Sequence, residues 1–374
     1  MSIKVLQGVA FTDENALRPY WQQEPVVLKA ALDVTALVPD PAGLVALITE
    51  TDLPSRLITG AEGGRFTLKH GPFESFKAPK GPWTVLIQAL EHLFPEYDAL
   101  RRAITWLPSW RFEDCMLSWA SEGGSVGRHV DQFSVFLVQL HGRRHWELGP
   151  RASSETPILA NQPLALVAAT TPELAVTVEP GDVIYLPPGV VHHGVSLDPD
   201  CMTLSIGFRA PDIGQLLEAA LEHCGSDASW MRYHDPEPGH RRGPAEITEA
   251  DLGRVQELFT AFCADRTRLA HILTSRVTAP YLDLMPEMEI EPEDAHDWID
   301  EDLNFTLDPG VRIAYFEDRV FINGEHIGDQ APAAILELAD TRAIHSQAIR
   351  QLDPEWHGCV VDLIVTGGLQ PPED

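Results

Sequence analysis

Residues 129–131 read HVD, and residues 179–192 read EPGDVIYLPPGVVH. On an extended strand, residues i and i+2 project from the same face. His129 and Asp131 can therefore reach one metal ion while Val130 points away. The short first stretch thus offers two metal ligands of different chemistry.

The longer stretch offers a third ligand. Its opening letters, EPGD, indicate a turn; residues 182–186 indicate a β-strand, and the PPG that follows indicates the end of that strand. His192 is therefore expected just beyond the strand, at the mouth of a barrel. Two histidines and one aspartate on one face of an octahedral metal leave three positions open, which is typical of non-haem Fe(II) oxygenases.

Other histidines compete for this role. His193 is adjacent to His192 in an extended segment and should face the opposite way, either on the surface or supporting the ligands from outside. His141 and His145 are expected to be ordinary surface histidines, in a hairpin turn and on the opposite face of a strand. The predicted ligand set is therefore His129, Asp131 and His192.

A cosubstrate site is predicted on the next strands. Residues 133–140 form an almost continuous apolar run that fits a buried strand, and residues 143–148 should return antiparallel to it, beside the metal ligands. Arg144 shares a face with Trp146, whereas Arg143 lies on the other face. A buried carboxylate needs a bidentate guanidinium, so we expect Arg144 to bind the distal carboxylate of 2-oxoglutarate. The alternative is a solvated surface pair of arginines.

Several stretches resemble those of the JmjC-type bacterial ribosomal oxygenases. These are cupin-like 2-oxoglutarate oxygenases that hydroxylate an arginine of a ribosomal protein. The matching stretches are GSVGRHVDQF at 124–133, GRRHW at 142–146, PPGVVHHG at 187–194, SIGFRAP at 205–211, WQQEPVVLK at 21–29, SRL at 55–57 and HGPFE at 70–74. The resemblance covers most of the chain. It implies a dioxygenase that uses Fe(II), 2-oxoglutarate and O₂ to hydroxylate an arginine at carbon three, in the sixteenth protein of the large ribosomal subunit. By position, it assigns the metal to His129, Asp131 and His192, and 2-oxoglutarate to Arg144.

The resemblance also implies an α+β fold in three parts. A double-stranded β-helix (cupin/JmjC) barrel is expected over residues 1–210, a helical dimerisation region over 211–279 and a winged-helix-like domain over 280–374. The residues support these expectations in part, since residues 213–222 have helical periodicity, and a second helix with an apolar face is expected from about Glu249 to Leu273.

In the C-terminal part, residues 311–322 read as a compact β segment, followed by a helix over 333–339, where Pro332 suits the first helical position. A further apolar stretch at 360–365 suggests another helix. Residues 233–244 and 285–294 are expected to be connecting segments.

The strand at residues 114–119 has candidate residues for binding the substrate. Asp114 and Met116 share one of its faces. An acidic group beside an apolar one suits the guanidinium and the methylene stem of an arginine. By resemblance, both line the substrate arginine pocket. The alternative is an ordinary aspartate at a sheet edge.

The strand at residues 202–208 places Thr203 and Ser205 on one face. The resemblance implies that Ser205 lines the substrate pocket and that Thr203 lies near the cosubstrate; the alternative is ordinary strand hydroxyls. Phe133 is expected to contact the substrate too, but the family pattern has tyrosine there. This departure leaves the metal site unchanged and bears on the identity of the substrate.

Composition agrees with a cytoplasmic enzyme of several domains. The chain has 374 residues, 44% of them hydrophobic, and neither a secretory leader nor a transmembrane span is expected. Its five cysteines are scattered, so buried reduced thiols are expected rather than disulfides. The formal net charge of −29 argues against direct nucleic-acid binding and suits a basic protein substrate.

Three other functions remain open from the sequence. Within the same class, the chain would be a histidine hydroxylase acting on another ribosomal protein. From different classes, it would be a metal-free cupin that serves as an interaction scaffold, or a zinc-dependent cupin isomerase that needs no oxygen.

Overall fold

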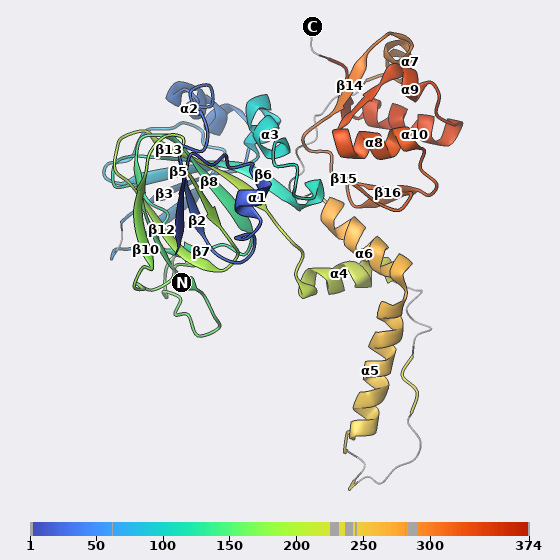
Figure 1. The fold of residues 1–374 in the computed structure, drawn as a ribbon, viewed down its shortest axis with the longest axis horizontal. Helices are drawn as coiled ribbons and strands as arrows, with labels where there is room; N and C mark the ends of the chain where they lie inside the picture. Colours follow the sequence, from blue (N-terminus) through green and yellow to red (C-terminus); the bar gives the residue numbers. More distant parts are fainter. Residues whose placement is uncertain are drawn as a thin grey trace. The chain divides into compact units, whose positions relative to one another are not determined.

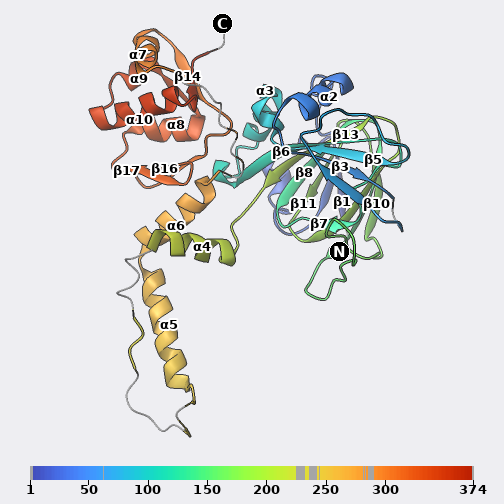
Figure 2. The same cartoon turned by 180° about the vertical axis from the view of Figure 1, so that it is seen from behind.

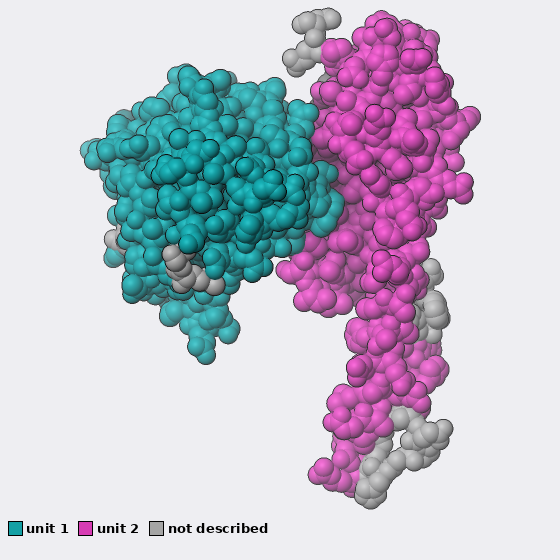
Figure 3. Space-filling model, in the orientation of Figure 1, with its two compact units in different colours: residues 1–210 teal, residues 211–374 magenta. Residues whose placement is uncertain are grey.

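The computed structural model describes residues 3–61, 63–224, 232–235, 242–243, 245–280, 282, 284 and 290–372. The chain divides into two compact units, residues 1–210 and residues 211–374 (Figures 1 and 3). Each unit has its own elements and is described by itself.

Unit 1 is built on two β-sheets. The larger sheet has nine strands in the order β1-β2-β11-β8-β13-β6-β5-β3-β4, and the smaller has four in the order β10-β9-β12-β7. The strands are β1 (Lys4–Gln7), β2 (Val26–Lys29), β3 (Ser55–Thr59), β4 (Thr67–His70), β5 (Trp83–Ile87), β6 (Phe112–Ala120), β7 (His129–Val130), β8 (Ser134–His141), β9 (Arg144–Arg151), β10 (Leu174–Val178), β11 (Val183–Leu186), β12 (Val190–Ser196) and β13 (Cys201–Phe208).

An apolar interior joins the two sheets. Val27 and Leu137 of the larger sheet belong to one buried cluster with Trp146 and Leu148 of the smaller sheet. Because successive strand residues face opposite sides, each strand contributes alternate residues to this interior. The two facing sheets form the double-stranded β-helix expected from the sequence, and the strand predicted at 182–186 is confirmed as β11.

The predicted pairing of residues 133–140 with 143–148 is wrong. Strand β8 pairs with β11 and β13, whereas β9 pairs with β10 and β12. Between them Gly142 adopts a left-handed φ of 64°, and Gln139 Nε2 donates to the carbonyl oxygens of His141 and Gly142 at 2.8 and 3.0 Å. The chain therefore crosses from one sheet to the other at this corner, which the local sequence pattern does not reveal.

Helices and aromatic residues cover the outer face of the larger sheet. The helices are α1 (Glu14–Leu17), α2 (Pro41–Glu50) and α3 (Pro95–Arg102), with 3₁₀ turns η1 (Leu90–His92) and η2 (Ser109–Arg111). The Trp21 ring, which follows α1, stacks on Tyr185 with a centroid distance of 5.3 Å and meets Phe208 edge-on at 6.0 Å. Aromatic pairs of this kind add stability beyond the area they bury.

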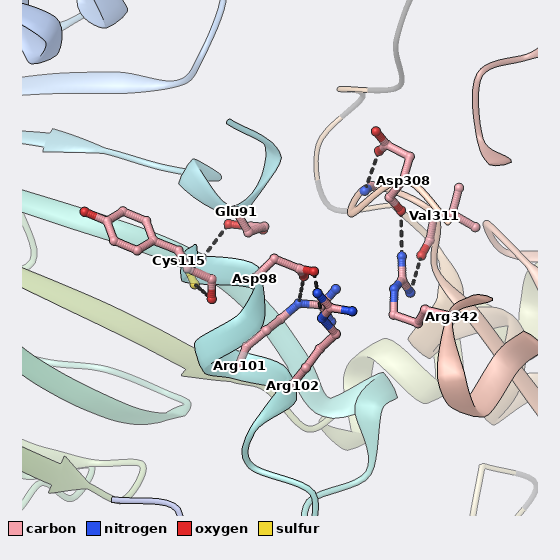
Figure 4. A network of polar contacts seen from close by, with 10 residues as sticks. Glu91, Asp98, Arg101, Arg102, Cys115, Asp308, Val311 and Arg342 are labelled. Atoms are coloured by element: carbon pink, nitrogen blue, oxygen red, sulfur yellow. Dashed lines mark hydrogen bonds and ion pairs between the residues drawn. The ribbon is translucent and has the colours of Figure 1, made fainter. Parts of the chain in front are cut away.

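Contacts of Arg101 and Glu91 link α3 and η1 to β6, and ion pairs within α3 hold Arg101 in place (Figure 4). Asp98 pairs with both Arg101 and Arg102, at 2.5 and 2.9 Å, and the Arg101 guanidinium lies 4.4 Å from the centroid of the Phe112 ring on β6. The buried Glu91 accepts a hydrogen bond of 2.8 Å from the backbone N–H of Cys115 on β6. The buried charges of Asp98 and Arg101 are tolerated because they are paired, whereas burial raises the pKa of Glu91 to about 8, so its carboxyl is mostly neutral near pH 7.

Unit 2 combines helices with two three-stranded sheets, ordered β18-β14-β19 and β15-β16-β17. The helices are α4 (Ile213–Cys224), α5 (Glu249–Ala264), α6 (Arg266–Thr278), α7 (Pro292–Asp300), α8 (Ala333–Thr341), α9 (Ser346–Ile349) and α10 (Pro354–Val365). The strands are β14 (Asn304–Leu307), β15 (Ile313–Phe316), β16 (Arg319–Ile322), β17 (Glu325–Gly328), β18 (Ala343–His345) and β19 (Leu369–Gln370).

The C-terminal part of unit 2 has its own core. Phe305, Ile335, Ile349 and Ile364 are among its buried residues. Arg342 ends α8 in a left-handed conformation and donates to the carbonyl oxygens of Asp308 and Val311 at 2.6 and 3.0 Å (Figure 4). The helix and strands predicted here are confirmed, although Pro332 is the residue before α8 rather than its first.

The helical part of unit 2 differs from the prediction. The single apolar-faced helix expected from Glu249 to Leu273 is wrong, because α5 ends at Ala264 and Asp265 caps a new helix, accepting from the N–H of Arg268 at 3.0 Å. Helices α4 and α6 pack against each other, while α5 projects away from the rest of the unit (Figures 1 and 2).

Some predicted features lie wholly or partly outside the described residues. These are the connecting segments at 233–244 and 285–294, and the side chain of Cys224. The other four cysteines are free thiols; Cys115 and Cys201 are buried as expected, whereas Cys263 is exposed. Across the described ranges, no helix combines the length and apolar character that a membrane crossing requires.

Candidate active site

Three predicted ligands meet in the smaller sheet of unit 1. His129 on β7 is the register partner of His192 on β12, and Asp131 directly follows β7. The Nε2 atoms of His129 and His192 lie 3.8 and 3.6 Å from the carboxylate oxygens of Asp131. Within the described part of the chain, these residues are the one histidine, cysteine or carboxylate group of three or more whose ligand atoms all lie within 4.8 Å of one another.

The position of His192 corrects one detail of the prediction. It lies inside a strand of its own, β12, and not simply beyond β11, and only 2% of its surface is exposed. The residues between β11 and β12 form a tight turn, in which Gly189 has a left-handed φ of 84° and donates its N–H to the carbonyl oxygen of Asp131 at 2.8 Å. The turn thus ties the segment carrying His192 to the backbone of another ligand.

Backbone carbonyls orient both imidazoles. His129 Nδ1 lies 3.0 Å from the carbonyl oxygen of Gly127, and His192 Nδ1 lies 3.0 Å from that of Val190. When Nδ1 carries the proton and donates it to the carbonyl oxygen, Nε2 keeps its lone pair. A neutral histidine binds a metal through such a lone pair. Burial and the neighbouring His129 lower the pKa of His192 to about 4, so this imidazole is neutral at physiological pH.

The turn before β11 is held by Asp182. Its carboxylate pairs with Lys29 and accepts from the N–H of Ala30 at 2.9 Å and of Glu179 at 2.8 Å. Gly181 in this turn has a left-handed φ of 89°, and a Cβ there would lie 2.6 Å from the carbonyl oxygen of Leu32. The EPGD letters therefore have a structural role at the start of β11.

The competing histidines lie outside the ligand cluster. His193 is buried, with Nδ1 3.8 Å from Glu147 Oε2, so of its two predicted locations the surface one is wrong. His141 is exposed as predicted, and the half-buried His145 bonds to the Thr177 hydroxyl at 3.2 Å. Sequence alternation assigns each ring to a side of its strand, but only the packed structure shows whether that side is covered.

Arg144 enters the interior of unit 1, and Arg143 does not. Arg144 is 2% exposed, and among the described residues its Nε and Nη2 atoms have no hydrogen-bond partner. Arg143 is exposed and forms an ion pair of 2.9 Å with Asp198. A guanidinium is always charged, so burying it without a partner is costly, and a bound carboxylate would relieve that cost. The residues present thus fit a carboxylate ligand.

Thr203 also faces the interior. It is the register partner of Gln139, and its hydroxyl donates to Gln139 Oε1 at 2.8 Å. Gln139 is the residue that bonds the carbonyls of the β8–β9 corner, immediately before Arg144. A chain of hydrogen bonds therefore connects Thr203 to the backbone that sets the position of Arg144.

The predicted substrate residues lie on β6, on β13 and directly before β8. Asp114 is 7% exposed and accepts from Gln88 Nε2 at 3.2 Å, while burial raises the pKa of its carboxyl to about 6. Met116 is half-buried and is the register partner of Ser205. Phe133 is half-buried beside the interior cluster.

Three further residues at this site were not found from the sequence. Gln88 bonds Asp114, Glu113 pairs with Arg209 at 2.7 Å, and the Arg209 guanidinium lies 5.2 Å from the centroid of the Phe133 ring. Strict alternation puts Glu113 on the opposite face from Asp114. A β-bulge between β6 and β13 changes this, and it depends on the partner strand, so β6 alone gives no signal of it.

Comparison with known proteins agrees with this geometry. Residues 99–216 match the model of a JmjC domain, and residues 261–370 match that of a ROXA-like winged helix. The chain is 28% identical over 358 residues to a protein of Escherichia coli (strain K12) named ribosomal protein uL16 3-hydroxylase, covering 94% of this chain and 95% of that one.

The chain belongs to the JmjC-type bacterial ribosomal oxygenases.

Solved structures of a ribosomal oxygenase from Escherichia coli share the whole fold of this oxygenase. One, in complex with cobalt and 2-oxoglutarate, has a TM-score of 0.82 and 27% identity, covering 98% of this chain and 99% of that one. Another, in complex with cobalt and succinic acid, has a TM-score of 0.81 and 26% identity, with the same coverage. The C-terminal part of this oxygenase is a winged helix, as the sequence indicated.

Proposed function

We propose that this protein is an Fe(II)- and 2-oxoglutarate-dependent dioxygenase that hydroxylates an arginine side chain, at carbon three, of the sixteenth large-subunit ribosomal protein, uL16. The observation that carries the proposal is the convergence of His129, Asp131 and His192 in the same barrel as the buried Arg144 guanidinium. The Escherichia coli relative named uL16 3-hydroxylase supports the substrate.

The metal would be held by Nε2 of both histidines and by the carboxylate of Asp131. Both imidazoles are already oriented by the Gly127 and Val190 carbonyls, so little reorganisation is needed. When bound, iron and 2-oxoglutarate together supply an oxidative decarboxylation that yields succinate and inserts one oxygen atom of O₂ into a C–H bond. The three open positions of such a site suit this chemistry.

Arg144 would bind the distal carboxylate of 2-oxoglutarate, with the Thr203 hydroxyl beside it. The guanidinium is buried, unpartnered among the described residues and next to the Trp146 ring, 5.9 Å from its centroid. A bidentate pair with a carboxylate would satisfy both of its free nitrogen atoms. These features explain why a fixed arginine, and not a mobile lysine, occupies the position.

The substrate arginine would be held by Asp114, Met116, Phe133 and Ser205. Asp114 supplies a carboxylate for the guanidinium, and Met116 and Phe133 supply apolar surface for the methylene stem. Bringing a guanidinium to Asp114 favours its ionised form, so binding would counteract the burial that raises the pKa of this carboxyl. The task of these residues is positioning, because the bond that is oxidised depends on how the side chain is held.

Mass spectrometry tests the function directly. Large-subunit ribosomal proteins and their peptides are incubated with the full-length protein, Fe(II), 2-oxoglutarate and O₂, beside a His192→Ala control. We expect one added oxygen on a single arginine of uL16, together with succinate, and neither with the control. Succinate without a modified ribosomal peptide would reject the substrate, and absence of both products would favour the scaffold function.

The same experiment distinguishes the arginine hydroxylase from the alternative enzyme of the same class. A histidine hydroxylase would add oxygen to a histidine of another ribosomal protein, whereas the buried Asp114 favours a cationic side chain. A zinc-dependent isomerase would turn over without oxygen, so an anaerobic sample distinguishes it.

We further propose that residues 1–210 form the catalytic domain, 211–279 a dimerisation region and 280–374 a winged-helix domain with a protein-contact role. Exposed apolar side chains support a homodimer through the helical region: Ile213, Leu217 and Leu221 on α4 and Leu252, Val255 and Phe259 on α5. Light scattering should give twice the mass of the chain, and Leu221→Glu with Phe259→Glu should halve it. A ribosomal substrate would place the reaction in the cytoplasm.

A further inference from the structure

A β-bulge brings two carboxylates to one side of the larger sheet in unit 1. The register of β6 and β13 shifts in this segment, so that Glu113 and Asp114 together lie opposite the single residue Gly207. Neighbouring residues of a regular strand face opposite ways, whereas the extra residue of a bulge re-aims its side chain. Both acidic residues therefore come close to Gly207.

Gly207 has no side chain, so the position of its Cβ atom is open. This position lies between the carboxylate of Asp114 and the ring of Phe133. A Cβ atom at Gly207 would lie 3.4 Å from Glu113 Cβ, 3.5 Å from Asp114 Oδ1 and 3.5 Å from Phe133 Cε2. These are ordinary contact distances, and the φ of Gly207 is not left-handed. Neither crowding nor backbone conformation requires a glycine here. A glycine inside a strand often marks a close approach of a ligand.

The charges around this position are unequal. Glu113 is paired with the guanidinium of Arg209 at 2.7 Å, and that guanidinium lies over the Phe133 ring. Asp114 accepts a hydrogen bond from the neutral amide of Gln88, and Arg209 and Arg56 lower its pKa only through their charge. Of the two carboxylates, Glu113 already has its cation, and Asp114 is the one suited to receive a second guanidinium.

The proposed function places the guanidinium of the substrate arginine between Asp114 and Phe133. We propose that the missing side chain of Gly207 leaves space for that guanidinium and determines how deeply the substrate enters. This inference rests on the proposed function. The carboxylate and the ring provide a charge partner and a stacking surface, both of which a guanidinium uses. A methyl group at residue 207 pushes the guanidinium outward and moves carbon three away from the metal ligands.

The test compares two peptides of uL16 sequence on the full-length protein with Fe(II), 2-oxoglutarate and O₂. One peptide has the target arginine, and the other has an analogue with one methylene fewer. For Gly207→Ala we expect kcat/KM on the arginine peptide to fall on the order of 100-fold, as for a misplacement of about 1 Å. The shortened peptide should lose much less, because its guanidinium fits the shallower space while carbon three stays in place.

A matched control is Gly43→Ala on α2. A Cβ there would have no atom within 4 Å, so it adds the same methyl group in open space of the same unit. In Gly43→Ala, kcat/KM on each of the two peptides should equal that of the wild type. If Gly207→Ala leaves the ratio of kcat/KM for the two peptides unchanged, the inference is overturned and the proposed function still stands. A wild type that hydroxylates no arginine peptide would overturn both.

A lowered melting temperature would reveal that Gly207→Ala misfolds. A second variant then tests the location of the guanidinium. Phe133→Leu removes the ring but keeps an apolar side chain. We expect it to weaken peptide binding about 10-fold, measured by fluorescence anisotropy, without changing the KM for 2-oxoglutarate. Unchanged peptide affinity would overturn the assigned location.

Discussion

Unit 1 and unit 2 each contain neighbouring histidines, but the two clusters have different surroundings. In unit 1, the rings of His129 and His192 lie 4.2 Å apart beside Asp131. In unit 2, His223 on α4 stacks on His271 of α6 at 3.5 Å, and His326 on β17 lies 5.7 Å from His271. The comparison separates the proposed metal ligands of unit 1 from a cluster of ring contacts in unit 2.

Proton affinity alone does not make this distinction. Burial lowers the pKa of both His192 and His271 to about 4, and a neighbouring histidine contributes in each case. What differs is the arrangement of the nitrogen atoms. In unit 1, backbone carbonyls occupy Nδ1 and direct Nε2 to a shared carboxylate, whereas the carboxylate of unit 2, Asp329, pairs with His326 and Arg319. The direction of the lone pairs, rather than a depressed pKa, therefore distinguishes the proposed ligand set from the histidine cluster of unit 2.

The largest expected effect is loss of metal binding in His192→Ala. Residues that only orient a ligand change metal affinity about 10- to 100-fold, so removal of a ligand should exceed about 100-fold. Titration with Co²⁺, followed by its visible absorption, measures this. His271→Ala is the matched control in the other cluster and should bind Co²⁺ as the wild type does. Equal losses in both variants would contradict the distinction.

The next effect concerns Arg144. Hydrogen bonds to a charged group contribute about 1.5–3 kcal/mol each, so Arg144→Met should raise the KM for 2-oxoglutarate by roughly 100-fold or more. The same change should raise the melting temperature of the ligand-free protein, since it removes a buried charge that lacks a partner. Arg143→Met, at the exposed residue directly before the same strand, should leave both quantities unchanged. A drop in melting temperature for Arg144→Met would show that the guanidinium is already satisfied.

A smaller effect is expected at Asp114. Asp114→Asn should weaken binding of the arginine peptide about 10- to 100-fold, because a charge-assisted bond becomes a neutral one. The pKa of Asp114 is about 6, so wild-type affinity should fall as the pH drops below that value and the carboxyl is protonated. The Asn variant should show no such fall. Isothermal titration between pH 5 and pH 8 tests both statements.

The smallest effect is on the stability of unit 2. The pKa of His271 is lowered to about 4 from an ordinary value of 6.5, so the unfolded chain binds the proton more readily than the folded one. Stability is therefore full above pH 6.5 and falls as the pH drops from 6.5 towards 4. His223, His326 and Arg319 face His271 and oppose its protonation. In His271→Gln, thermal unfolding should depend less on pH over this range; an unchanged slope would assign the dependence to other groups.

Local geometry explains which parts of the site could be predicted. The two-residue spacing of His129 and Asp131, and the Pro-Pro-Gly turn before His192, constrain the backbone within a few residues. The face of Arg144 follows from the same alternation. These features are visible in the sequence because period-two alternation operates within a single strand.

Features that depend on distant partners could not be predicted. The crossing between β8 and β9 depends on which strands lie alongside, and the bulge opposite Gly207 depends on the register of two strands. Asp265 ends one helix and starts the next, although the apolar pattern continues through it. His193 is buried because other elements cover its face of β12. In each case tertiary packing overrides a local pattern.

The hydrogen bond from Gly189 to Asp131 has a consequence for the dynamics of the site. Asp131 contributes its carboxylate to the ligand cluster and its carbonyl oxygen to the turn that precedes His192. Fixing the carboxylate with an ion therefore also reduces the local opening of that turn. The Gly189 amide should exchange its hydrogen with solvent more slowly when the ion is bound, so a single backbone N–H reports the occupancy of the centre.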